Sequence, residues 1–64
     1  MTIELTNGRK ITGNAFTLNY MSMALNEAAE NYRRKGLSYI ACDCEHDSDI
    51  IYRVLKEKGF YDAK

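Results

Sequence analysis

The chain has 64 residues, enough for a single compact domain (1–64) and too few for a second. Nine Lys and Arg balance nine Asp and Glu, so the formal net charge is zero and gives no general affinity for polyanions. A core this small can spare few side chains for the walls of a catalytic cleft, so we expect a non-enzymatic protein without a cofactor. No apolar run is long enough to span a membrane, and the sequence predicts a cytoplasmic protein.

The N-terminal segment predicts a β-hairpin, because alternating residues lead into an Asn-Gly turn signal. A two-residue loop would place Ile11 on the polar face. A three-residue loop, 6–8, with its glycine in the left-handed conformation, pairs Ile3 with Ile11. It also places Glu4 opposite Lys10, so apolar residues share one face and unlike charges share the other. We therefore expect the three-residue loop.

The longest predicted element is a helix from Thr17 to Lys35, closed by a left-handed Gly36. Its apolar stripe, at steps of three and four residues, comprises Leu18, Met21, Leu25, Ala28 and Tyr32. Thr17 is the expected N-cap, with Asn14 as the rival start.

After the glycine, Leu37–Cys44 is rich in Tyr, Ile and Cys and predicts a third strand. Asp47 or Ser48 would cap a second helix that ends at Gly59. Its apolar face comprises Ile50, Ile51, Val54 and Leu55. The expected fold is α+β, ββαβα, with a three-stranded antiparallel sheet in the order 2-1-3 against two helices. The alternative places the third strand parallel to the second.

Three potential metal ligands follow one another at alternate positions: Cys42, Cys44 and His46. On a strand they would share one face and could hold zinc with a fourth ligand. The chain has no fourth Cys or His, so we expect the cysteines to be reduced thiols and the protein to bind no metal.

The same segment carries four acids in seven residues: Asp43, Glu45, Asp47 and Asp49. A helix N-terminus explains Asp47 and Asp49, whereas acids are disfavoured in the predicted strand. Acids spaced along a strand face are similar to the phosphates of a nucleic-acid strand, which would suit a basic groove on a partner. Tyr39 shares that face, and it is the expected neighbouring anchor among five tyrosines.

In length, in lack of linkers or a catalytic motif, and in this acidic strip, the chain resembles the anti-CRISPR proteins, small inhibitors from phages and mobile elements. The resemblance implies a monomeric inhibitor that binds a CRISPR effector, such as a type I surveillance complex, and obstructs target DNA by mimicry or by steric block. The alternative is a small nucleic-acid-binding or regulatory protein that uses Arg33, Arg34 and Lys35, together with Arg9 and Lys10.

Overall fold

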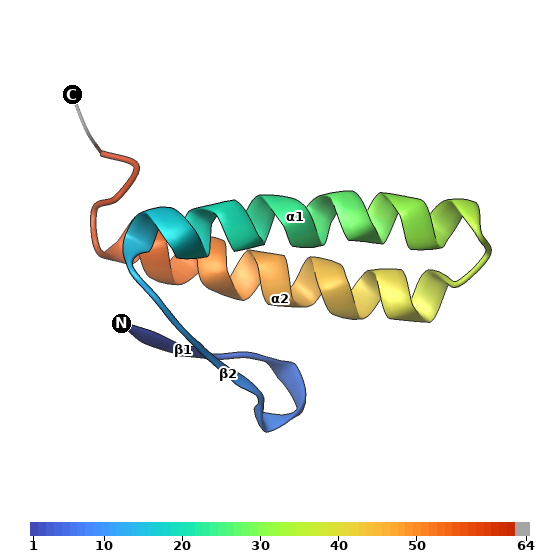
Figure 1. Cartoon of the computed structure of the whole chain (residues 1–64), viewed down its shortest axis with the longest axis horizontal. Helices are drawn as coiled ribbons and strands as arrows, with labels where there is room; N and C mark the ends of the chain where they lie inside the picture. Colours follow the sequence, from blue (N-terminus) through green and yellow to red (C-terminus); the bar gives the residue numbers. More distant parts are fainter. Residues whose placement is uncertain (63–64) are drawn as a thin grey trace.

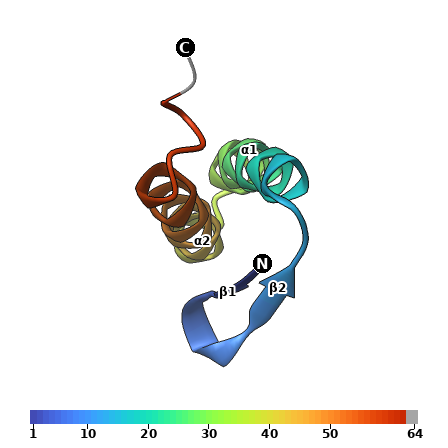
Figure 2. The same ribbon diagram turned by 90° about the vertical axis from the view of Figure 1, so that its left-hand side faces the viewer.

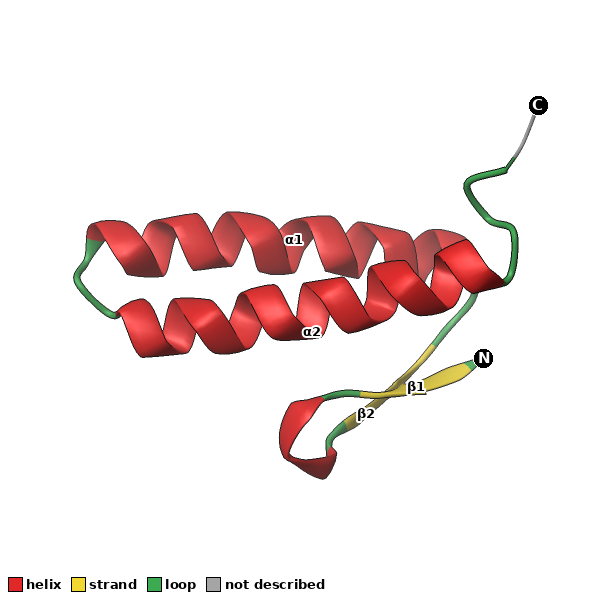
Figure 3. Cartoon of the chain, turned by 180° about the vertical axis from the view of Figure 1, so that it is seen from behind, coloured by secondary structure: helices red, strands yellow, loops and turns green. Residues whose placement is uncertain are grey.

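Two antiparallel helices, α1 (Ala15–Arg34) and α2 (Ser38–Glu57), form most of the computed structural model, which describes residues 1–62 (Figure 1). A short hairpin of β1 (Thr2–Glu4) and β2 (Lys10–Thr12) precedes them. It lies on one side of the helix pair, and the segment after α2 rises on the opposite side (Figure 2). The hairpin underlies only the half of the pair away from the α1–α2 connection (Figure 3). Within the described residues, no strand covers the face opposite the hairpin.

The predicted ββαβα fold with a three-stranded sheet is wrong. Leu37–Cys44 is not a strand: from Ser38 on, the segment belongs to α2, and the sheet in the described part of the chain has only β1 and β2. Nor does a helix begin at Asp47 or Ser48, which are both buried in the middle of α2. The physical reason is a repeat of three and four residues that runs through the whole helix. Its members are Ala41, Cys44, Ser48, Ile51 and Leu55.

The predicted register of the β-hairpin is confirmed. Ile3 pairs with Ile11 and Glu4 with Lys10, around the 3-10 turn η1 (Thr6–Gly8). Gly8 has φ +75°, as the three-residue loop requires, and the preceding asparagine also has a positive φ. The isoleucine pair faces the helices, where Ile3 is 3% exposed.

The helix start differs from the prediction and the helix ends agree with it. α1 is capped by the rival residue Asn14, whose Oδ1 accepts from the Thr17 amide at 2.8 Å. At its C-terminus Gly36 has φ +80°, and the Leu37 amide donates to the Tyr32 carbonyl oxygen at 2.9 Å. The second helix ends in the same Schellman arrangement at its own glycine.

The core lies where the hairpin meets both helices, and it consists of Ile3, Leu18, Ile51 and Leu55. Further along, the helices meet through small side chains. Ser22 and Ser48 each donate a hydroxyl to the other's backbone carbonyl, at 3.2 and 2.9 Å, and their Oγ atoms are 2.9 Å apart. Only small side chains permit helix backbones to approach this closely. The buried face of α1 is therefore rotated relative to the predicted stripe. Leu18 is fully buried, and the buried face continues through Ser22 and Ala29. The other members of the predicted stripe are half-buried.

Candidate protein-binding surface

The four acids predicted as one strip do not lie on one face. The prediction assumed that this segment is a strand, but it belongs to α2. In a helix, the side chains of residues two apart point about 200° away from each other. Asp43 and Asp47 therefore lie toward one side of the helix, and Glu45 and Asp49 toward another. Tyr39 precedes Asp43 by one turn and is 72% exposed, so these two residues of the predicted set remain neighbours.

Asp47 is a structural residue. It is 2% exposed, and its Oδ1 accepts from the amide and the hydroxyl of Thr6, at 3.0 and 2.8 Å. Its Oδ2 accepts from Arg9 Nη2 at 2.6 Å. These contacts fasten the tip of the β-hairpin to the middle of α2, and we call them the Asp47 clasp. No side of this carboxylate is left for a partner.

Two of the other acids are paired with arginines. Glu45 binds Arg33 across the helix pair, and Asp49 binds Arg53 one turn on, at 2.9 Å. The hydrogen bond from Arg33 to Glu45, and to a smaller extent the negative charge of Glu45, raise the pKa of the Arg33 guanidinium above its usual value. These pairings offset the negative charge on which mimicry of a nucleic acid would depend.

The basic residues of the alternative nucleic-acid-binding hypothesis also take part in different contacts. Arg33 faces Glu45, and Arg9 belongs to the clasp, so neither presents an uncompensated charge. Arg34 donates to Asn31 Oδ1 at 3.5 Å, and Lys35 is the C-cap of α1. The basic residues at the end of α1 thus sit where a helix dipole favours them, without forming one patch.

The helix also separates the potential metal ligands. Cys42 and His46 are exposed, whereas Cys44 is half-buried against the helix pair, so the three do not share a face. Within residues 1–62, no group of three Cys, His, Asp or Glu side chains lies close enough together to hold a metal ion.

A cluster of aromatic rings, which we call the aromatic cluster, joins the two helices and the segment after α2. Its members are Phe16, Tyr52, Phe60 and Tyr61. Phe16 meets Phe60 edge to face with 5.3 Å between ring centroids, and Tyr61 lies 5.1 Å from Phe60 and 4.9 Å from Tyr52. Phe16 is nevertheless 78% exposed, so this is a ring surface open to solvent.

Hydrogen bonding and a nearby cation hold the aromatic cluster in place. The Tyr61 hydroxyl donates to Asn19 Oδ1 of α1 at 2.5 Å, and Lys56 Nζ lies 6.0 Å from the centre of the Tyr52 ring. Desolvation of the phenol, and then the charge of Tyr52, raise the pKa of Tyr61 above its usual value. The Tyr61 ring is therefore held in place by a hydrogen bond to α1 in the unbound protein, which lowers the entropy that this side chain loses on binding.

Sequence reasoning missed this surface, although one signal was present. With Asn14 as N-cap, Phe16 falls in the first turn of α1, on the side away from the stripe. The count of five tyrosines indicates that some serve an interface, but the predicted strand face shared with Asp43 pointed to Tyr39 rather than to the aromatic cluster.

Comparison of the chain with models of protein families, with curated proteins and with solved structures finds no match. Neither of the two described helices is long and apolar enough to cross a membrane. No pocket opens on the surface formed by residues 1–62. The candidate site is therefore a surface, the aromatic cluster.

Proposed function

We propose that the chain is a small non-enzymatic inhibitor that binds a nucleic-acid-handling effector protein, of the anti-CRISPR kind that its sequence resembles. The observation that carries this proposal is the aromatic cluster, with Phe16 78% and Tyr52 43% exposed. Aromatic side chains are enriched at the centres of protein interfaces, where they dominate the binding energy. A group of four rings in mutual contact on a chain of this size is a strong candidate for such a centre.

The pairing of the acids favours a steric block over mimicry of DNA. Glu45 and Asp49 are neutralised by arginines and Asp47 is buried, so α2 does not present a row of free negative charges. A ring cluster instead suits an apolar site on the effector. The inhibitor would then obstruct target DNA by its bulk, with duplex DNA itself not a ligand.

The test is a target-DNA binding assay with a purified type I CRISPR surveillance complex, incubated first with the protein. We expect the wild-type protein to reduce the fraction of duplex bound. Phe16→Ser should weaken this inhibition about tenfold or more, because truncation of a central aromatic contact commonly costs that much.

Tyr39→Ser is the matched control, since Tyr39 is 72% exposed and lies outside the aromatic cluster. It should inhibit like the wild type. If Tyr39→Ser loses inhibition while Phe16→Ser keeps it, the contact surface is instead the one predicted around Tyr39 and Asp43. If the wild-type protein leaves DNA binding unchanged, the inhibitor function is wrong.

A further inference from the structure

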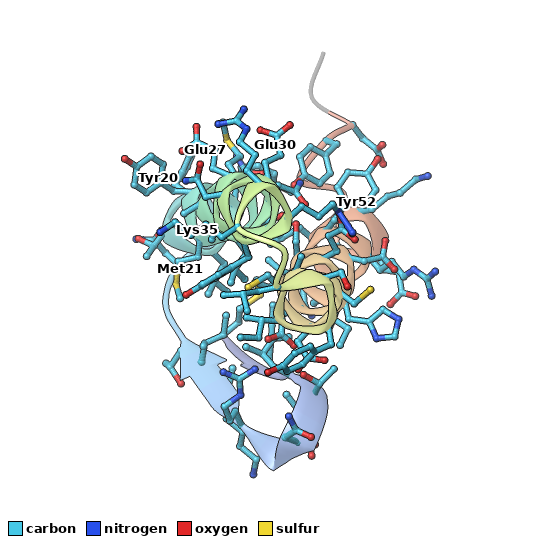
Figure 4. The ribbon with its side chains drawn as sticks, turned by 90° about the vertical axis from the view of Figure 1, so that its right-hand side faces the viewer. Tyr20, Met21, Glu27, Glu30, Lys35 and Tyr52 are labelled. Atoms are coloured by element: carbon cyan, nitrogen blue, oxygen red, sulfur yellow. The ribbon has the colours of Figure 1, made fainter. Side chains whose placement is uncertain are left out.

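The side of α1 that faces away from the core carries a second stripe at steps of four and three residues. It begins with Phe16, Tyr20 and Met23, which are 78%, 73% and 57% exposed. The same steps continue to Glu27 and Glu30. We call these five residues the outer α1 face. Tyr20, Glu27 and Glu30 all project from α1 on the side away from the β-hairpin (Figure 4).

The outer α1 face is divided into an apolar half and an acidic half. A helix rises about 1.5 Å per residue, so about 10 Å separates Phe16 from Met23 and about the same distance separates Met23 from Glu30. The whole face is therefore comparable in length with one protein contact site. Its apolar half is continuous with the aromatic cluster, because Phe16 belongs to both.

The two glutamates differ from three of the five acids of α2, because no cation of the described residues pairs with them. Glu45, Asp47 and Asp49 each pair with an arginine, but no described residue forms an ion pair with Glu27 or Glu30. Arg34, one turn beyond Glu30, bonds Asn31 instead. The outer α1 face thus offers two carboxylates without an ion pair, which follow three exposed apolar side chains along the helix, with Arg34 one turn beyond them.

We propose that the outer α1 face docks a protein surface with an apolar centre and a basic rim. This inference rests on the proposed function, and it names the chemistry of the partner. Apolar side chains of the partner cover Phe16, Tyr20 and Met23, while Lys or Arg side chains meet Glu27 and Glu30. The rim charges act mainly on association rate and specificity, and the apolar contacts on affinity.

A second copy of the chain is a poorer occupant on grounds of charge. If two outer α1 faces packed in parallel, the glutamates of one copy would lie against those of the other. If they packed antiparallel, the glutamates would lie against exposed aromatic rings. The first cation along the stripe is Arg34, one turn beyond Glu30. Like charges without a cation between them oppose association. A basic partner removes that cost.

The test titrates the isotope-labelled full chain with a synthetic amphipathic helical peptide of about 20 residues that has leucines on one face and lysines along both edges. A matched peptide carries glutamate in place of each lysine. We expect amide chemical shifts to change along α1 between residues 16 and 30. We also expect the lysine peptide to bind at least about tenfold more tightly than the glutamate peptide at low salt.

The variant Glu27→Lys/Glu30→Lys should weaken binding of the lysine peptide by about tenfold, and added salt should weaken wild-type binding toward the same level. The control, Asp43→Lys/Glu57→Lys, makes the same change in net charge on α2 and should bind like the wild type. Equal binding of both peptides, shifts centred on α2, or equal effects of the two double variants would overturn the proposal.

Sedimentation of the protein alone supplies the remaining outcome. A dimer that dissociates in Phe16→Ser/Met23→Ser would assign the outer α1 face to a second copy and overturn the proposal. None of these measurements contains the CRISPR complex. The outer α1 face and the inhibitor function can therefore fail separately.

Discussion

At the scale of single residues, Asp47 shows how a buried charge is stabilised. Removing a carboxylate from water costs several kcal/mol unless donors replace the lost hydration. Here two groups of Thr6 and one of Arg9 donate to it within 3.0 Å. The Arg9 side chain is 59% exposed, so Arg9 keeps most of its hydration, whereas the Asp47 carboxylate loses nearly all of its own. The result is a fixed attachment between segments about 40 residues apart.

Asp47→Ala should lower the free energy of unfolding by about 2 to 3 kcal/mol, because it leaves the Thr6 amide in the clasp without its acceptor. Urea denaturation followed by circular dichroism measures the change. Asp43→Ala is the control, since Asp43 is exposed on the same helix and its loss should change stability by less than about 0.5 kcal/mol. Equal effects of the two variants would mean that the clasp does not hold the hairpin.

At the scale of elements, sequence reasoning succeeded at the hairpin turn and at the C-terminal ends of the helices, where glycines decide the conformation, and it misplaced the start of α1 by choosing Thr17 over Asn14. The hairpin register followed from alternation and turn chemistry, and both helix ends followed from Gly36 and Gly59. It failed over Leu37–Cys44, where Tyr, Ile and Cys favour a strand and only the packing partner can decide. The acids that were unexpected in a strand, Asp43 and Glu45, are ordinary on the exposed side of a helix.

The error over α2 also carried into the candidate site. A strand over that segment predicts that alternate residues share one face, and both the acidic strip and the potential zinc site depend on that geometry. The aromatic cluster could not be predicted in this way, because it joins Phe16 to Phe60 through the antiparallel pairing of two helices. Sequence spacing alone does not contain that pairing.

At the contact between Ser22 and Ser48 each hydroxyl reaches the backbone of the other helix, and both side chains are buried. Ser48→Leu should lower the free energy of unfolding by about 1 to 3 kcal/mol, because it forces the helices apart and leaves Ser22 without its partner. Thermal and urea denaturation measure the effect. Ser38→Leu, at the exposed start of the same helix, should cost less than about 0.5 kcal/mol. A stable Ser48→Leu variant would contradict the close packing.

At the scale of the whole molecule, the two sides of the helix pair are covered to different extents. The β-hairpin covers one side of the pair along the half away from the α1–α2 connection, and on the other side the segment after α2 lies at one end, where Tyr61 bonds Asn19 (Figure 3). The accessible surface is 4610 Å², against about 4,200 Å² expected for a globular monomer of 7.4 kDa. The surplus agrees with an elongated molecule, which measures 38 × 27 × 15 Å along its principal axes.

The stability of the whole chain should fall in alkaline solution through Tyr61. Because folding raises the pKa of this phenol, the folded state holds its proton more tightly than the unfolded state. Its contribution is therefore complete below the unfolded pKa of about 10 and is lost as the pH rises through the higher folded pKa. Urea denaturation at about pH 9 and pH 11 should show a steeper loss for the wild type than for Tyr61→Phe. Tyr39→Phe, the control, should keep the wild-type slope, and a wild-type slope in Tyr61→Phe would contradict the assignment.

The Asp47 clasp has a consequence for the order of folding. The helices are joined by three residues, 35–37, so they can pair after closing a very short loop, whereas the clasp must bring together residues 41 and 38 positions apart. Contacts of low sequence separation form fastest. The carboxylate therefore already stands on a formed helix when the hairpin reaches it. The β-hairpin, whose paired residues are only 6 to 10 positions apart, can form by itself, and we expect its docking onto α2 to come last.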